Sequence, residues 1–261
     1  MTDWLTDREA LAEQYANASN LNDRIALHER YSINDDGLWH WVFDRFDLPN
    51  RTRVLSVGCG PADLWGENAG RIPEGWDVTV TDLSPGMVGE AHENLADCSR
   101  PFALAVAAAE SIPFRSNAFD AATANFMMYH VPDRKRALAE IRRILKPDGT
   151  LLAATSGAEH LQELRAVQEG VHGEALPRVT SFRLENGREQ LDPFFESVAC
   201  HRYDNALALT EVEPLVAWAL SREEFDESDV AALGEAFAER FEDGVFRVWK
   251  DMGLFVARAA E

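Results

Sequence analysis

Residues 53–84 constrain the fold of this chain more than any other stretch. Val54–Val57 is a short apolar run without polar alternation, which is typical of a strand covered on both faces. The run ends at Gly58-Cys59-Gly60, and a helix-compatible segment follows from Ala62. Two glycines at such a turn let the backbone bend tightly and let a ligand approach closely. The pattern predicts a ligand-binding turn at the end of a buried strand.

A second apolar run covers Trp76–Thr81 and stops at Asp82, which lies 22 positions after Gly60. Nucleotide-binding α/β folds place a ribose-binding carboxylate about 20 residues after the glycine turn. Asp63 stands where a dinucleotide fingerprint requires a third glycine, and its charge opposes a pyrophosphate there. S-adenosylmethionine (SAM) has a ribose, no phosphate, and two cationic groups. The residues therefore favour SAM over NAD.

Four segments, in order across residues 54–155, resemble the class I SAM-dependent methyltransferases, in particular the type 11 group that includes quinone-biosynthesis methyltransferases. These segments are Val54–Gly60, Thr81–Met87, Glu110–Phe114 with Phe119-Asp120, and Arg143–Gly149. The resemblance implies an α/β class: a Rossmann-like class I methyltransferase fold with a mostly parallel seven-stranded sheet, one antiparallel edge strand and an N-terminal helical lid. It also implies SAM as cofactor and S-adenosylhomocysteine as product.

The resemblance assigns a set of residues to the cofactor. Backbone atoms of the glycine turn would approach the methionine part, Asp82 would accept hydrogen bonds from both ribose hydroxyls, and the next residues would surround the adenine. The residues assigned are Gly58, Cys59, Gly60, Asp82, Leu83, Met87, Ala109, Glu110 and Asn125. For Met87, packing in the core is an equal alternative.

Three positions depart from the family pattern. Ser56 replaces the usual acid before the glycines, Ala62 replaces a usual glycine, and Ala108 replaces an aspartate that usually binds the adenine amino group. These departures keep open a SAM-binding protein without transferase activity. A nucleotide-sugar or NAD(P)-binding oxidoreductase is the other alternative; Asp63 and the lack of a Tyr-x-x-x-Lys pair argue against it.

The segment after the fourth apolar run, Ala118–Asn125, is expected to border both methyl donor and acceptor, because ligands of open α/β sheets bind at the carboxyl ends of the strands. His130 is the candidate general base there, since imidazole titrates near neutral pH; a structural role is the alternative. Helices across Asp7–Phe46 are expected to cover the pocket, or else to pack in the core. The candidate pocket residues are Tyr15, His28, Tyr31 and Tyr129.

The chain is expected to be one domain over residues 1–261. Within it we expect a helical lid at 1–50, a cofactor-binding core at 51–155, and C-terminal helices and closing strands at 156–261. Val245–Arg258 predicts either the closing antiparallel strand or a hairpin that turns at Asp251-Met252-Gly253. The predicted reaction is an in-line methyl transfer to a small-molecule acceptor.

The formal net charge is −20, with 45 acidic and 25 basic residues, and only three of the basic residues are lysines. This surplus opposes binding to nucleic acids and to anionic membranes. It is typical of proteins from salt-loving microbes, with an ordinary acidic bacterial protein as the alternative. The three cysteines have neither disulfide nor metal spacing, so no metal is expected. With neither a signal peptide nor an apolar run of spanning length, a cytoplasmic monomer or homodimer is expected.

Overall fold

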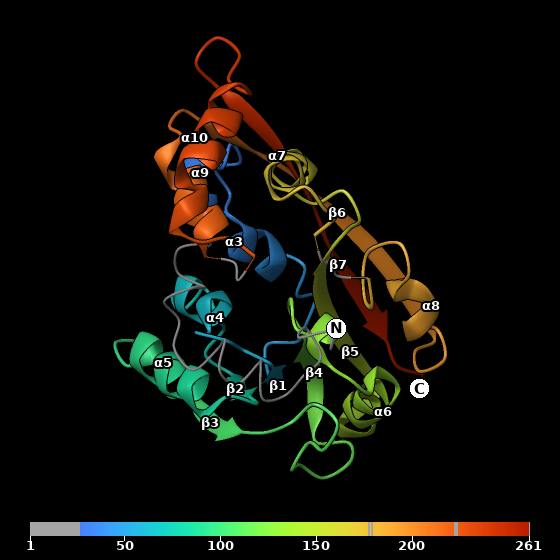
Figure 1. Cartoon of the computed structure of the whole chain (residues 1–261). Helices are drawn as coiled ribbons and strands as arrows, with labels where there is room; N and C mark the ends of the chain where they lie inside the picture. The colour runs from blue at the N-terminus through green and yellow to red at the C-terminus, as the bar shows by residue number, and fades with distance from the viewer. Residues whose placement is uncertain (1–26, 177, 179, 222–223, 261) are drawn as a thin grey trace.

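The computed structural model describes residues 27–176, 178, 180–221 and 224–260. The helix expected over residues 7–26, with the candidate pocket residue Tyr15, lies outside the described residues. Residues 27–31 are helical, and a helix α3 (Leu38–Phe43) follows the turn at Gly37. Figure 1 shows the whole chain, coloured by residue number.

The described part of the chain forms one seven-stranded sheet with the order β3-β2-β1-β4-β5-β7-β6 (Figure 1). The strands are β1 (Thr52–Val57), β2 (Trp76–Asp82), β3 (Ala103–Val106), β4 (Phe119–Thr123), β5 (Leu145–Ser156), β6 (Ser197–Leu209) and β7 (Phe246–Arg258). Pairing is parallel from β3 to β5, and β7 is antiparallel to both β5 and β6. The predicted mostly parallel sheet is confirmed, and its antiparallel pairing lies at one edge, where β7 separates β5 from the outermost strand β6.

Two apolar clusters cover the two faces of the sheet. One packs α3, α4 (Asp63–Glu67) and α5 (Pro85–Leu95) on residues such as Val54, and the other packs α6 (Arg134–Ile144) and α8 (Gly187–Leu191) on residues such as Leu55. Because consecutive strand residues point to opposite faces, both faces of β1 must be apolar. This arrangement explains the run without alternation at Val54–Val57, and Figure 1 shows α5 and α6 on opposite sides of the sheet.

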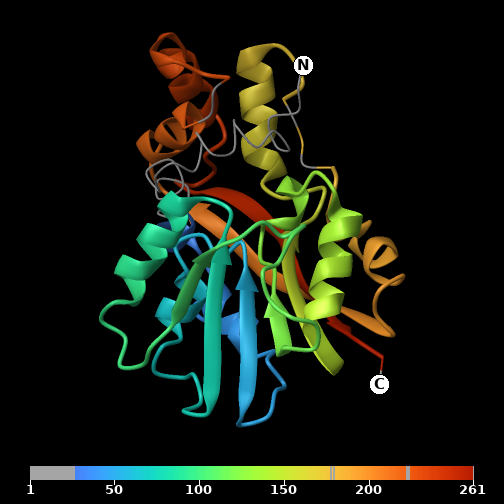
Figure 2. The same cartoon turned by 90° about the horizontal axis from the view of Figure 1, so that it is seen from below.

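A third apolar cluster joins residues 161–248 of the chain to its first described residues. It contains residues of α7 (Gln162–His172), α9 (Glu213–Leu220), α10 (Val230–Ala238), β6 and β7, together with Leu27 and Tyr31. In Figure 2 these three helices stand together beyond one end of the sheet. They are placed to cover the carboxyl ends of the parallel strands.

Hydrogen bonds attach the first described segment to the same region. Ser32 forms an antiparallel bridge with Leu207 of β6, and Asn205 Nδ2 donates to Ser32 Oγ at 2.6 Å. Arg30 donates to both carboxylate oxygens of Glu211, at 2.8 and 2.9 Å. Residues 27–34 therefore belong to the cap that α7, α9 and α10 form.

The hairpin alternative for Val245–Arg258 is wrong. β7 continues through residues 251–253 and pairs with β6 from Ser197↔Arg258 to Leu209↔Phe246. A Cβ at Gly253 would lie 2.5 Å from the His201 carbonyl oxygen, so Gly253 allows close approach of two strands. The sequence pattern of a turn and that of a tight strand contact are the same here. Among the C-terminal helices expected at 156–261, the first begins at Gln162, after Leu161 in a left-handed conformation (φ 53°).

Candidate functional site

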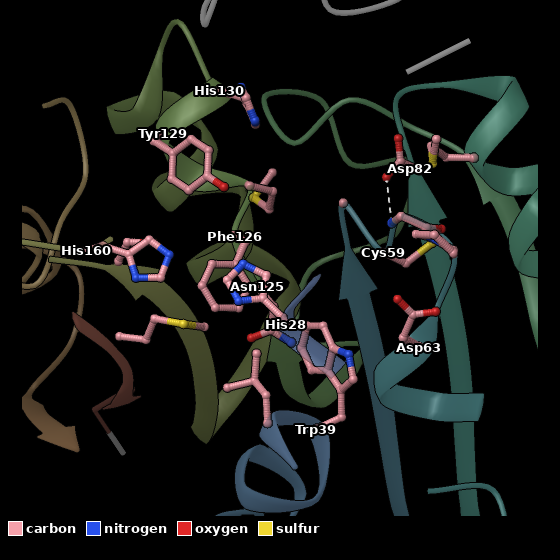
Figure 3. A pocket seen from close by; sticks show the side chains of 18 of the residues that line it. His28, Trp39, Cys59, Asp63, Asp82, Asn125, Phe126, Tyr129, His130 and His160 are labelled. Atoms are coloured by element: carbon pink, nitrogen blue, oxygen red, sulfur yellow. Dashed lines mark hydrogen bonds between the residues drawn. The ribbon is translucent and has the colours of Figure 1, made fainter. Parts of the chain in front are cut away.

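A cavity of about 1050 Å³ opens at the carboxyl ends of β1, β2 and β4, under the cap. Its wall combines the turn after β1, the end of β2, the segment around the short 3-10 helix η2 (Met128–His130), and residues of α7, β6 and β7. Figure 3 shows the labelled side chains around it. This is where open α/β sheets place their ligands.

The turn after β1 needs its glycines for two different reasons. Gly58 and Gly60 both have positive φ, 62° and 55°. A Cβ at Gly58 would also lie 2.7 Å from Met127 Cγ, whereas a Cβ at Gly60 would meet no atom within 4 Å. Ala62 has φ 68°, a left-handed conformation that explains why the family pattern has glycine at this position. The turn presents backbone, without bulky side chains, to the cavity.

Asp82 ends β2 directly opposite this turn. Its Oδ2 accepts a hydrogen bond from the Gly60 N–H at 2.9 Å, drawn as a dashed line in Figure 3, and its Oδ1 accepts one from the Ser84 N–H at 2.9 Å. Burial raises the pKa of Asp82, while these backbone N–H groups act in the opposite direction. The carboxylate is therefore fixed in position and retains acceptor capacity on the cavity side.

Further acids line the same end of the cavity. Burial, and secondarily Glu29, raises the pKa of Asp63; burial, followed by Asp63, raises the pKa of Glu67. Like charges this close disfavour one another, and a cationic ligand group would relieve the repulsion. We call this side, which Asp63, Glu67 and Asp82 form, the acidic end.

The opposite side of the cavity has a different character. His28 and His160 stack with ring centroids 6.1 Å apart, and the Lys250 Nζ lies 5.8 Å from the centroid of the Tyr203 ring. Burial, followed by the charge of Lys250, lowers the pKa of His28 to about 3, and burial lowers the pKa of His160 well below its usual range. Burial lowers the pKa of Lys250 to about 8. Gln168 of α7 is fully buried and also lines the cavity. We call the group His28, His160, Gln168 and Lys250 the basic end.

Aromatic side chains lie between the two ends, as Figure 3 shows. Trp39 and Phe126 meet edge to face with centroids 6.1 Å apart, and the rings of Tyr129 and His130 are 4.5 Å apart. Ser181 Oγ donates to the Tyr129 carbonyl at 3.0 Å, which fixes the η2 segment to the chain beyond β5. These rings make the middle of the cavity wall largely aromatic.

The structure brings most of the sequence-predicted residues to one cavity. Those lining it are Gly58, Cys59, Gly60, Asp82, Leu83, Met87, Ala109, Glu110, Asn125, His28, Tyr129 and His130. Met87 lies on the buried face of α5 and also lines the cavity, so it both packs in the core and borders the site. The Asn125 side-chain oxygen accepts from the Ala154 N–H at 3.1 Å, which ties the end of β4 to β5.

Tyr31 requires a correction, because it does not line the cavity. Its ring is buried in the third apolar cluster, and its hydroxyl donates to Glu211 Oε2 at 3.2 Å. Helical spacing places Tyr31 on the inward face, but the neighbour on that face is the C-terminal cap. Tyr31 therefore holds the first described helix to the C-terminal part of the cap.

Sequence reasoning missed the basic end except for His28. His160, Gln168 and Lys250 come from residues 156–261, which have no motif in common with the resembled family. One signal was present: Lys250 is one of three lysines and stands in an apolar strand pattern beside Met252 and Leu254. No corresponding signal marks His160 or Gln168. Within the described residues, no group of three or more His, Cys, Asp or Glu side chains is arranged to hold a metal.

The sheet order and the site at the strand ends define a Rossmann-like methyltransferase fold. Solved structures share it: YcgJ of Bacillus subtilis has a TM-score of 0.62 at 15% identity, covering 85% of this chain and 98% of that chain. Phosphoethanolamine N-methyltransferase 2 of Haemonchus contortus, solved with S-adenosyl-L-methionine, has a TM-score of 0.54 at 19% identity, covering 85% of this chain and 52% of that one.

The sequence comparisons narrow the class further. A methyltransferase-domain family model matches residues 55–153. The ubiquinone/menaquinone biosynthesis C-methyltransferase UbiE of Citrifermentans bemidjiense is 30% identical over 157 residues, 59% of this chain and 66% of the relative. The UbiE protein of Bordetella avium is 36% identical over 132 residues, which cover 47% of this chain and 51% of the relative. The chain thus spans about half to two thirds of these relatives, and it resembles class I SAM-dependent methyltransferases, quinone-biosynthesis types among them.

Proposed function

We propose that this protein is a SAM-dependent methyltransferase that acts on a small-molecule acceptor. The proposal rests mainly on the Asp82 carboxylate, which lies beside the glycine turn and accepts hydrogen bonds from the N–H groups of Gly60 and Ser84. A ribose diol requires a fixed acceptor pair of this kind. The acidic end suits a ligand with an ammonium and a sulfonium, and opposes a pyrophosphate. The methyltransferase relatives support the same assignment.

The residues present fit this cofactor. The Gly58–Gly60 turn would admit its amino-acid part, Asp82 would hold the ribose, and Leu83, Met87, Ala109 and Glu110 would surround the adenine. When bound, SAM supplies a methyl group activated by a sulfonium charge. The described residues contribute orientation and exclusion of water: the aromatic side chains between the two ends would align the acceptor, and the cap would close over it.

Proton removal depends on the acceptor. A phenol or a carbon acid requires a base, and His130 and Tyr129 are the titratable groups of the η2 segment on the cavity wall. His28, with a pKa of about 3, stays neutral and is a weak base. His130 is therefore the first candidate for general base, and an acceptor that is already an anion or free amine would need none. The ubiquinone/menaquinone relatives favour a planar, oxygen-bearing acceptor.

A titration of thermal stability tests the proposal. The protein is heated with SAM, S-adenosylhomocysteine, NAD⁺ or NADP⁺, at low and at molar salt, because a net charge of −20 is screened only at high ionic strength. Stabilisation by SAM and S-adenosylhomocysteine alone is expected. Stabilisation by NAD⁺ or NADP⁺ instead would overturn the proposal. Transfer of a labelled methyl group to a panel of phenols and amines separates an enzyme from an inert SAM-binding protein.

A further inference from the structure

The basic end of the cavity holds a buried cation that the fold does not need. Lys250 lies in β7 with 8% of its surface exposed, and it forms no ion pair with any described residue. Burying an ammonium without an anionic partner costs several kcal/mol, on the order of what a whole domain has as net stability. An apolar residue of similar length would stabilise β7 better. The position of Lys250 therefore indicates a ligand.

Neutral polar atoms of residues that line the same cavity also lack hydrogen-bond partners. The fully buried Gln168 has neither its Nε2 nor its Oε1 hydrogen-bonded, and the Nδ1 atoms of His28 and His160 have no hydrogen-bond partner among the described residues. Each such atom costs about 1–3 kcal/mol when buried unsatisfied. All three residues line the cavity, and Figure 3 shows His160 on the side opposite Asp82. The Gln168 Nε2 and the Nδ1–H tautomer of each neutral imidazole can donate hydrogen bonds, and the Lys250 charge acts on both imidazoles.

Several charged side chains of the cavity wall are separated by sign, with acids at one end and cations at the other. Asp63, Glu67 and Asp82 form the acidic end, whereas the charges of Lys250 and Arg165, the lining cations among the described residues, act on His160 at the other end. Glu29, Asp35 and Glu110 are the remaining acids of the wall. Most of the surface of a chain with net charge −20 repels anions, so a local cation is required to hold one. The apolar neighbours Leu161, Trp218 and Met252 exclude water there and strengthen the attraction. A ligand carrying a negative group would be bound with that group away from Asp82.

We propose that Lys250, Gln168, His28 and His160 bind an anionic oxygen group of the methyl acceptor, a carboxylate or a phenolate. The inference rests on the proposed methyl transfer at the acidic end. Burial lowers the pKa of Lys250 to about 8, so the ammonium remains mostly protonated at pH 7. One ammonium with neutral amide and imidazole donors matches a single negative charge. Anchored there, the acceptor would direct its other end toward the methyl donor, across the rings of Phe126 and Tyr129.

The test compares an anionic probe with its neutral isostere. Binding of 3,4-dihydroxybenzoate and 3,4-dihydroxybenzamide is measured by calorimetry at pH 7 on the full chain saturated with S-adenosylhomocysteine. We expect the acid to bind at least about tenfold more tightly than the amide, as a charge-assisted hydrogen bond requires. Lys250→Met should abolish this preference, and Lys135→Met, on the exposed surface of α6, should leave it intact.

Gln168→Leu provides a second variant, which keeps the volume and removes both amide atoms. It should weaken binding of the acid while leaving the affinity for S-adenosylhomocysteine unchanged. Equal binding of acid and amide to the native protein, no binding of the acid at millimolar concentration, or an intact preference in Lys250→Met would overturn the inference. Failure of S-adenosylhomocysteine to bind, with the acid preference intact in its absence, would instead refute the proposed function and leave the anion site standing.

Discussion

Asp82 and Gly60 are joined by a hydrogen bond of 2.9 Å between the Gly60 N–H and the Asp82 Oδ2. The bond links the end of β2 to the turn after β1, and the second oxygen of the same carboxylate accepts from Ser84 at the start of α5. One side chain thus fixes two segments of the cavity wall. Its effect on ligand binding should therefore exceed that of a single surface contact.

Asp82→Ala should weaken S-adenosylhomocysteine binding by about 1.5–3 kcal/mol, the range for hydrogen bonds to a charged group. Calorimetry measures the change directly. Asp77→Ala is the matched control, since Asp77 lies on the same strand, is exposed, and pairs only with Arg53 at 3.4 Å among the described residues. An unchanged dissociation constant in Asp82→Ala would place the ribose elsewhere.

Gly58→Ala should lower the free energy of unfolding by about 1–3 kcal/mol, because an alanine there has both an unfavourable φ and a contact with Met127. Gly89→Ala is the control within a helix: its Cβ would meet no atom within 4 Å. That variant should stabilise α5 by up to about 1 kcal/mol. Denaturant unfolding of both variants measures the difference. Equal stability of Gly58→Ala and the native protein would show that the turn relaxes.

Lys250→Met should stabilise the protein, and by more at pH 7 than at pH 10. The pKa of Lys250 falls from 10.5 in the unfolded chain to about 8 in the fold. The unfolded state therefore binds more protons between these values, so native stability rises with pH across that window, by about 3 kcal/mol in total. Unfolding of both proteins at pH 7 and pH 10 checks this. A gain independent of pH would indicate that Lys250 is already well solvated.

His28→Gln should make the protein less sensitive to acid. Because the pKa of His28 is 6.5 in the unfolded chain and about 3 in the fold, native stability is lost as pH falls from 6.5 toward 3. The variant lacks this titration, so its unfolding free energy should fall by a few kcal/mol less over that range. His92→Gln, on the exposed surface of α5, should keep the native profile. Identical acid profiles for His28→Gln and native protein would contradict the burial of His28.

His130→Ala should leave S-adenosylhomocysteine affinity nearly intact and reduce turnover by about 10²–10⁴-fold for an acceptor that must lose a proton. Turnover of an acceptor that is already deprotonated should change little in the same variant. Single-turnover methyl transfer with both kinds of acceptor makes the comparison. Full activity with the protonated acceptor would assign His130 a structural role.

The part of the cavity that contains the glycine turn and Asp82 could be predicted because its signals are local. The strand, glycine turn and carboxylate from Val54 to Asp82 follow one another within a short stretch, and parallel strands bring their ends to one edge. The direction of Tyr31 could not be predicted, since periodicity shows that a face is covered and not which element covers it. The continuous β7 could not be separated from a hairpin, because Gly253 is used for close strand contact.

The basic end could not be predicted for a related reason. His160 and Gln168 join the cavity wall only when the α7 region is placed over the sheet. Lys250 joins it only when β7 is paired with β6. Such positions depend on long-range packing that no short motif records. The one usable signal was Lys250, because lysine is rare in this chain and this one stands in an apolar strand.

The place of β7 between β5 and β6 also sets an order of assembly. As a chain emerges from the ribosome, residues of β1 to β5 are available to pair before β7 exists, and β5 is left with an open edge. The basic end of the cavity contains both His28 and Lys250, which are 222 positions apart. It can therefore form only after Lys250 has been synthesised. The half that would recognise the methyl donor can thus be organised early in synthesis, whereas the proposed anion site forms only when the last strand is inserted.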